Sequence, residues 1–364
     1  MIRKLLVVFV VALVVLPVVP GLAQDDGIVS AVNDDIITRD EFHARVQFVR
    51  WQYLKELEAL YELTAGNMGI APTYVLALVD NLENPELLGD AVLTQMEDEL
   101  LLWRTGESMG VTPTAEDAAE REAQFFSLWT EIPVDELAEN DVAQQFISEW
   151  YAGATEASGL SEDDLRYLFA TEALRDMLYQ TLGEEISPTE LAVNTRHILC
   201  AWHPDNLASL AEPTPDERAA ADACIADAQA QLAEGVPFAD VARELSDDPG
   251  SAPVGGDLDW SFLSYLVENY AAAVETAELD TLIGPVETEF GLHLIEVLDR
   301  EERELSPAQL EEARAGYFDL WLLELRLDSS AERSDDWAEG LPTSPGLDSL
   351  DPEIQAAIER VRAN

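Results

Sequence analysis

Two of the chain's four histidines lie inside short apolar segments that are typical of β-strands. His197 lies in RHIL and His293 lies in FGLHLIEV. Alternate residues of a strand share a face, so His293 is expected to share one with Ile295 and Val297. Either histidine alone is typical of a satisfied core residue. Two histidines on neighbouring strands, however, could hydrogen-bond through their imidazoles and leave one defined tautomer facing a pocket.

A second candidate region for chemistry is the stretch 246–260, SDDPGSAPVGGDLDW, which holds four aspartates among two prolines and three glycines. It could be a solvated loop, a calcium loop or the rim of a site that needs a rigid, acid-lined backbone. The four aspartates do not have the spacing of an EF-hand loop, and no glutamate completes one, so no metal site is predicted. Gly255 and Gly256 would permit a tight turn into a sheet.

The elements that must position these residues alternate between strand and helix patterns over about a hundred residues. Ser187–Glu190 predicts a helix start. The other predicted elements are a strand over 195–200, a helix closed by Gly235, short helices over 238–245 and near 266–277, and two final strands, IGPVET and LHLIEVLD. This pattern predicts a compact α+β domain with helices around a small sheet.

In this order and spacing, the motifs closely resemble the parvulin family of peptidyl-prolyl cis/trans isomerases, over about residues 192–301. The resemblance implies that His197 and His293 are the family's paired histidines and that Asp248 is the acidic member of the catalytic set. It also implies a substrate-binding pocket for the proline ring formed by Leu258, Leu266, Tyr270, Thr288 and Phe290. The family's reaction uses no cofactor, and none is expected.

Some residues depart from the family pattern. Asp259 replaces the last glycine of the motif GGDLG, and Leu266 replaces the usual methionine. The alternative of a client-binding chaperone with a catalytically inactive parvulin domain therefore stays open. The loop AWHPDNLASLAEPTP has no Arg or Lys cluster, so phosphoserine-proline selectivity is not expected, and its His203 is expected to be solvated.

The first residues, MIRKLLVVFVVALVVLPVVPGLAQ, have the charged start, apolar run and small-residue end of a secretory signal peptide, predicted over 1–23. The mature protein is then expected outside the cytoplasm, in the periplasm, in the cell envelope or secreted. An uncleaved helix that anchors the protein at a membrane surface is the alternative, although the apolar run falls short of the roughly 20 residues that span a bilayer.

The region 24–190 is predicted to be mainly helical. It opens with a hairpin turning at Asn33–Asp35, followed by a capping box of Thr38 and Glu41 that starts a long helix. Further helix starts are predicted at Thr114 and Ser161. Together with the predicted signal peptide, this organisation resembles the SurA/PrsA-type foldases of the bacterial envelope.

After the parvulin-like region, 302–330 predicts a helix that begins with a capping box of Ser306 and Gln309. It is too apolar to stand alone in water, so we expect it to dock on the helical N-terminal domain. The tail 331–364 is acidic and interrupted by proline and glycine. We expect it to be partly mobile, with one short helix over 352–361.

The formal net charge of −53 makes nucleic acid a poor partner, because such a surface repels phosphate backbones. The resemblance implies that the partners are unfolded or partly folded exported polypeptides containing Xaa-Pro bonds. An acidic scaffold or matrix protein is a more distant alternative. The two cysteines, Cys200 and Cys224, do not have metal-site spacing; they are candidates for a disulfide or for two buried free thiols.

Overall fold

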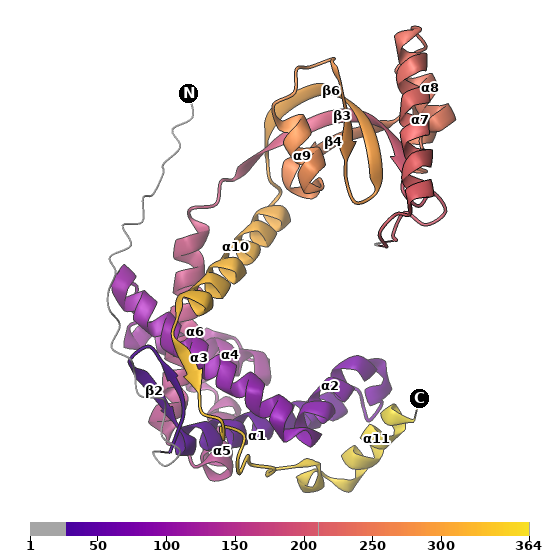
Figure 1. Ribbon diagram of the computed structural model, residues 1–364. Coiled ribbons are helices and arrows are strands. Elements are labelled where there is room, and N and C mark those ends of the chain that lie inside the picture. The colour runs from indigo at the N-terminus through magenta and orange to yellow at the C-terminus, as the bar shows by residue number, and fades with distance from the viewer. Residues whose placement is uncertain (1–26, 210, 364) are drawn as a thin grey trace. The chain divides into compact units, whose positions relative to one another are not determined.

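The computed structural model describes residues 27–209 and 211–363, which belong to two compact units. The helical unit extends to Gly183 and resumes at Ala315, and the sheet unit is Glu184–Arg314 (Figure 1). The α+β fold class is confirmed: a mainly helical region is completed by a C-terminal helix, and a small antiparallel sheet carries its own helices. The predicted signal peptide lies outside the described residues. Among the helices that are described, none is both long enough and apolar enough to cross a bilayer.

The helical unit begins with the predicted hairpin, turning at Asn33, and continues through helices separated by short turns. Its strands are β1 (Ile28–Val32), β2 (Asp35–Thr38) and β7 (Ala331–Arg333), in the order β2-β1-β7. Its helices are α1 (Arg39–Leu63), η1 (Met68–Ile70), α2 (Pro72–Glu83), α3 (Pro85–Met109), α4 (Ala115–Thr130), η2 (Val134–Glu139), α5 (Asp141–Ser158), α6 (Glu162–Gly183), the later part of α10 (Pro307–Asp328), η5 (Leu347–Ser349) and α11 (Pro352–Arg362).

The predicted capping box at the start of α1 is confirmed. The Thr38 hydroxyl accepts from the Glu41 amide, and the Glu41 carboxylate accepts from the Thr38 amide at 2.9 Å. These bonds satisfy amide donors that have no partner inside the helix.

Thr38→Ala is expected to lower the free energy of unfolding of the helical unit by about 1 kcal/mol, because the side-chain acceptor of the cap is lost. Urea unfolding followed by tryptophan fluorescence measures the change. Thr38→Ser, which keeps the hydroxyl, is the matched control and should unfold near the wild-type midpoint. Equal losses in both variants would contradict the assignment of the effect to the cap.

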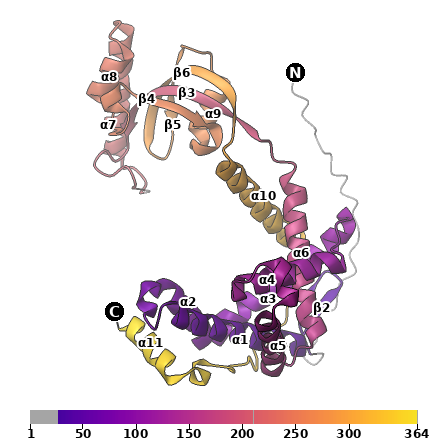
Figure 2. The ribbon, with the colours of Figure 1, turned by 180° about the vertical axis from the view of Figure 1, so that it is seen from behind.

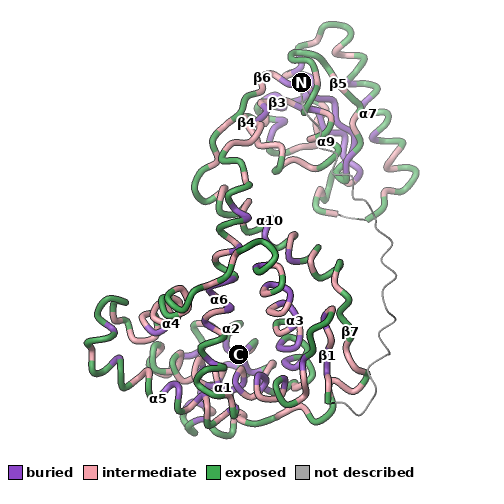
Figure 3. The backbone as a smooth tube through the Cα atoms, turned by 90° about the vertical axis from the view of Figure 1, so that its left-hand side faces the viewer, coloured by how far each residue is buried: buried purple, intermediate pink, exposed green. Residues whose placement is uncertain are grey.

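The C-terminal helix α10 docks on the N-terminal helices, as the sequence predicted. Phe318 and Leu322 are buried in one cluster with Leu102, Leu174, Leu178 and Leu182 of α3 and α6. In the same unit, Arg326 pairs with Asp98 through both guanidinium arms, with Nε at 2.6 Å from Oδ1. Buried positions recur along α3 and α6, as expected for helices in the centre of a unit (Figure 3).

The acidic tail, for which partial mobility was expected, contains a strand and a helix that pack on the helical unit. β7 pairs antiparallel with β1, and the Arg333 guanidinium donates to both oxygens of the buried Glu97 carboxylate, at 2.8 and 2.6 Å. The helix predicted over 352–361 is present as α11 and packs on α1 and α2. The sequence indicated mobility because this segment is charged and interrupted by proline and glycine. Its apolar residues are widely spaced and lie on one face only when α11 forms.

The sheet unit contains one antiparallel sheet, with the strand order β4-β3-β6-β5, and the helices that cover it (Figure 2). Its elements are β3 (Thr189–Ala201), α7 (Pro215–Ala233), α8 (Phe238–Leu245), η3 (Ala252–Val254), β4 (Asp257–Phe262), η4 (Leu263–Tyr265), α9 (Glu268–Glu275), β5 (Leu282–Glu287) and β6 (Gly291–Glu304). The helix start predicted at Ser187–Glu190 is wrong: β3 begins at Thr189 and pairs with β6 along its whole length, from Thr189 opposite Glu304 to Ala201 opposite Gly291.

The two faces of this sheet bury different cores. Ile198 and Leu294 point toward α7 and α8, with which they form one cluster. Val193, Ile295 and Val297 face α9 on the other side. Because the side-chain period of a strand is two, His197 and His293 fall on the α9 face.

Candidate active site

The two histidines lie on neighbouring central strands and contact each other. In the register of β3 and β6, His197 is opposite Ile295 and Leu199 is opposite His293, so the histidines are diagonal neighbours on one face. Their Nδ1 atoms are 3.1 Å apart, and both side chains are buried. His293 therefore shares a face with Ile295 and Val297, as its spacing predicted.

Asp248 completes a hydrogen-bonded chain with this pair. Its Oδ2 is 2.9 Å from Nε2 of His197, and the Thr288 hydroxyl is 2.8 Å from Nε2 of His293. A carboxylate can only accept, so His197 donates to Asp248. The order of partners is then Thr288, His293, His197, Asp248.

The proton positions within this chain follow from the burial of His293. The pKa of His293 is lowered to about 3, mainly by burial and also by the nearby His197, although the charge of Asp248 opposes both. His293 therefore carries one proton at neutral pH. In an arrangement where His197 gives its one proton to Asp248, Nδ1–H of His293 donates to Nδ1 of His197, and Nε2 of His293 accepts from the Thr288 hydroxyl.

The acid-rich stretch 246–260 delivers Asp248 to this site. Asp248 accepts backbone N–H groups from Gly250 and Ser251, at 3.0 and 3.3 Å, and the Ser251 hydroxyl donates to the same carboxylate. The hydrogen bond from His197 holds the pKa of Asp248 far below its usual value, and the one from Ser251 adds to it, whereas partial burial opposes both. The carboxylate is thus ionised and fixed, with a fifth of the side chain (21%) exposed.

The flanking residues fasten the loop to the edge of β3. The Asp247 amide donates to the Leu199 carbonyl at 2.8 Å, and the Asp247 carboxylate accepts from the Ala201 amide at 2.9 Å. Gly256, at φ +82°, lies so close to β3 that an added Cβ would be 2.2 Å from the His197 carbonyl oxygen. A glycine is therefore required where the chain enters β4. Prolines, glycines and aspartates therefore occur together in this stretch for two reasons. The prolines and glycines shape the loop, and the aspartates attach it to β3 and to His197.

The departure at Asp259 leaves this geometry in place. Asp259 has φ +56°, the left-handed conformation for which a glycine is favoured. Its amide donates to Asp257 Oδ1 at 2.8 Å, and its own Oδ1 accepts from the Trp260 amide at 2.8 Å. Short acidic side chains tolerate this conformation through such local bonds, so the backbone adopts the shape that glycine would give.

The residues predicted to bind proline lie in three places: Thr288 in the hydrogen-bonded chain, three residues in an apolar cluster, and Phe290 outside that cluster. Leu258, Leu266 and Tyr270 belong to the apolar cluster beneath the histidines. The Tyr270 ring is edge-on to both imidazoles, with centroids 6.1 Å from His197 and 5.5 Å from His293. Phe290 lies outside this cluster and is exposed.

Sequence reasoning missed two polar members of the site. The Ser251 Oγ lies 3.0 Å from Nε2 of His197, and Thr195 Oγ1 accepts from the Tyr270 hydroxyl at 3.2 Å. Both had a signal in the sequence. Ser251 follows Asp248 by three residues, a common side-chain bonding distance in turns, and Thr195 precedes His197 by two, which places it on the same strand face.

The remaining candidates lie away from the histidine pair. Cys200 and Cys224 form a disulfide, with Cα atoms 6.0 Å apart, that joins β3 to α7 on the opposite face of the sheet. His203 was expected to be solvated, but its side chain is only 16% exposed. Its ring is hydrogen-bonded to the Glu217 carboxylate in the first turn of α7 and to the Ala211 carbonyl, at 3.1 and 2.9 Å. Across residues 27–209 and 211–363, no cluster of three or more His, Cys, Asp or Glu side chains could hold a metal ion.

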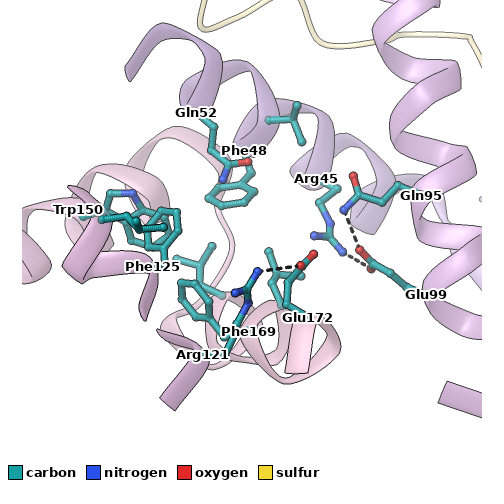
Figure 4. A pocket seen from close by; sticks show the side chains of 14 residues that line it. Arg45, Phe48, Gln52, Gln95, Glu99, Arg121, Phe125, Trp150, Phe169 and Glu172 are labelled. Atoms are coloured by element: carbon teal, nitrogen blue, oxygen red, sulfur yellow. Dashed lines mark hydrogen bonds and ion pairs between the residues drawn. The ribbon is translucent and has the colours of Figure 1, made fainter. Parts of the chain in front are cut away.

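The helical unit holds a separate cavity of about 260 Å³. One side is aromatic, and Figure 4 shows the rings of Phe48, Phe125, Trp150 and Phe169 gathered there. Arg45 and Glu99 form an ion pair on the other side. A second pair joins Arg121 and Glu172, with Nη2 3.5 Å from Oε2. The cavity combines apolar surface with a few polar groups, which is the usual composition of a ligand-binding pocket.

Comparison with known proteins identifies the class of the sheet unit. Residues 197–299 match the rotamase family model, described as the PPIC-type PPIASE domain. The sheet unit is therefore a parvulin-type domain, and the predicted resemblance is confirmed.

The relatives place this domain in a narrower group. A chaperone SurA from Methylococcus capsulatus is 38% identical over 128 residues, 32% of this chain and 27% of that protein. A foldase protein PrsA from a Geobacillus species is 40% identical over 73 residues, 20% of this chain and 26% of that protein. The crystal structure of the peptidylprolyl isomerase PrsA from Bacillus cereus is 17% identical and covers 76% of this chain and 90% of its own, with a TM-score of 0.38. The chain therefore carries a SurA/PrsA-like parvulin domain, and the matched regions span about a quarter of the length of these curated relatives.

Proposed function

We propose that the parvulin domain accelerates rotation about Xaa-Pro peptide bonds without a cofactor. The observation that carries the proposal is the closed chain from Thr288 through His293 and His197 to Asp248, which fixes an ionised carboxylate at a partly exposed position. The family match of residues 197–299 supports the same reaction.

The reaction needs neither a nucleophile nor a metal. The rotational barrier of about 18–20 kcal/mol comes from the partial double bond of the amide, and the cis and trans forms of Xaa-Pro differ little in free energy. Twisting the bond removes the conjugation and lowers the negative charge on the carbonyl oxygen. A fixed carboxylate near that oxygen therefore disfavours the planar amide more than the twisted one.

The other site residues hold the substrate and the carboxylate in place. Leu258, Leu266 and Tyr270 supply an apolar surface for the proline ring, and the exposed Phe290 is available to close over it. The two histidines and Thr288 position Asp248 rather than transfer protons, because His293 is too weak a base to take part at neutral pH.

On the scale of the whole chain, we propose an extracytoplasmic folding factor that acts on unfolded or partly folded exported polypeptides containing Xaa-Pro bonds. The SurA and PrsA relatives support this role. Export is supported by the Cys200–Cys224 disulfide, since disulfides persist mainly in oxidising compartments, and by the signal peptide predicted over 1–23.

The second candidate function is a client-binding chaperone whose parvulin domain is inactive. The aromatic cavity of the helical unit favours it, because that cavity offers an apolar contact independent of the parvulin site. Such a protein would suppress aggregation of a denatured model protein and leave Xaa-Pro rotation unchanged.

NMR exchange spectroscopy on a proline-containing tetrapeptide tests the proposed activity. The cis and trans signals should exchange faster when the wild-type protein is added in substoichiometric amounts. Heat-denatured protein is the control and should leave the exchange rate unchanged. No acceleration by the folded protein, together with suppressed aggregation, would favour the inactive-chaperone alternative.

A further inference from the structure

The C-terminal helix α11 occupies an apolar groove on the helical unit. The groove is formed by α1, η1 and α2, and its buried side chains are Leu54, Leu57, Met68, Val75, Leu78, Val79 and Leu82. Figures 1 and 2 both show α11 lying beside α2. Without α11 these side chains would form a continuous exposed apolar patch, which in soluble proteins marks a binding surface.

The segment formed by α11 and the turn before it has the apolar spacing of an amphipathic helix. Leu350, Ile354, Ala357, Ile358 and Val361 are all buried in the groove. The opposite face carries exposed residues such as Glu353, Ala356 and Glu359. Apolar residues at intervals of three and four are the pattern by which one helix enters a groove of another protein.

The contacts that hold the tail differ on the two sides of Gly346. Upstream, Trp337 and Leu341 pack against the core of α1 and α3. Two guanidinium groups also bind the backbone of the tail there: Arg39 donates to the carbonyls of Asp336 and Glu339, each at 3.0 Å. Arg50 donates to those of Thr343 and Pro345, at 2.7 and 2.8 Å.

Downstream of Gly346, apolar packing is supplemented by polar contacts at the rim. Tyr61 donates to Glu353 at 3.2 Å, and Arg362 pairs with Glu83 at 2.6 Å. The Arg362 and Glu83 side chains are 30% and 53% exposed, so their pairing adds little.

These features make α11 a separable unit. A helix of 11 residues is marginal by itself, so the segment that leaves the groove also unfolds, and the entropy it regains offsets much of the lost apolar burial. Segments of this kind open locally without the rest of the protein.

We propose that the groove of α1, η1 and α2 is a binding site for amphipathic helices of other polypeptides, and that α11 is its exchangeable resident, released at Gly346. The preferred partner presents apolar residues with the spacing of Ile354, Ile358 and Val361. A basic residue near the C-terminal end of its helix would reproduce the Arg362–Glu83 pair, as a small addition to the apolar contacts. The identity of the partner as a folding client rests on the proposed function; the exchange of α11 does not.

The test measures binding of a fluorescein-labelled peptide of residues 347–364, LDSLDPEIQAAIERVRAN, to the full-length protein by fluorescence anisotropy. The full-length variant Ile354→Asp/Ile358→Asp should hold α11 out of the groove. Because a competing occupant reduces the apparent affinity by the fraction of open groove, this variant should bind the peptide about tenfold or more tightly than wild type. Ala356→Asp adds an acid to the exposed face of the same helix and should behave as wild type.

Two results would overturn the proposal. One is equal peptide affinity for the double variant and for wild type. The other is equally strong binding of a control peptide that carries aspartate at both isoleucine positions. Hydrogen exchange on the wild-type protein tests it without any substitution. Amides of α11 should exchange well before those of α1 and α2, and exchange of all three at one slow rate would show a permanent core element.

The two proposals can fail separately. Peptide binding without any suppression of aggregation would support the groove and reject the chaperone role. Suppressed aggregation with no peptide binding by the double variant would support the chaperone role and reject the groove as a binding site.

Discussion

Asp248→Ala is expected to lower the rate at which the protein catalyses Xaa-Pro rotation by about a hundredfold, the loss typical of removing one fixed electrostatic contact to a transition state. The carboxylate is ionised and partly exposed, whereas the imidazoles that hold it are buried. Its charge is therefore the part of the network that can act on a substrate carbonyl. Exchange spectroscopy on a proline-containing tetrapeptide measures the rate.

Two further variants separate charge from structure. Asp248→Asn keeps an oxygen that can accept the Gly250 amide but removes the charge, so it should lose most of the activity. It should also lose some stability, because the low pKa of Asp248 means that its ionised form stabilises the fold. Asp247→Asn removes the neighbouring charge and still accepts the Ala201 amide, so it should stay within about twofold of wild type. A fully active Asp248→Asn would show that the network shapes the site without contributing its field.

The parts of this fold that could be predicted from sequence are those fixed by residues close together in the chain. The capping box at Thr38, the turn at Asn33 and the start of α6 after Ser161 each depend on side chains within about four positions. Local bonding of this kind competes with few alternatives, so its sequence signal is reliable.

The first half of β3 could not be predicted, because its conformation depends on a distant partner. Thr189–Asn194 pair with the end of β6, more than a hundred residues away, and both segments are rich in charged and polar residues. Proline and an acid after a serine suggested a helix start, yet the cross-strand ladder decides the outcome. Strand propensity is context-dependent for this reason.

The candidate site shows the same division. His197, Asp248 and His293 were predicted through the family resemblance, and the structure brings them into one hydrogen-bonded chain. The spacing of Asp248 and Ser251 allows a bond between their side chains, but it does not show that Ser251 also reaches His197, because this depends on how the loop turns after Pro249. The docking of α11 was missed because its groove is made by helices nearly three hundred residues earlier in the chain.

The stability of the parvulin domain is expected to fall as the pH drops from 7 to 4.5, and His293 is expected to be the main cause. Its pKa in the folded state is about 3, below the ordinary value of 6.5, so between these values the unfolded chain binds a proton that the folded site rejects. Stability from this group is thus complete above pH 6.5 and is lost as the pH falls. Over this window the loss amounts to about 2 kcal/mol. The Asp248 pKa is also lowered, but its contribution is lost only below about pH 4.

Urea titrations followed through the NMR signals of β3 and β6 report on the parvulin domain alone. His293→Gln, which cannot gain the proton, should flatten the dependence between pH 7 and 4.5. His203→Gln is the matched control: hydrogen bonds to Ala211 and Glu217 raise the pKa of His203, so its small contribution has the opposite sign and is lost as the pH rises. A variant at His293 that keeps the full wild-type slope would contradict the assignment and move the acid sensitivity to other groups of the domain. A flattened slope would show that the burial of one imidazole in the candidate site also sets the lower pH limit of the domain's stability, because the folded site rejects the proton that the unfolded chain binds.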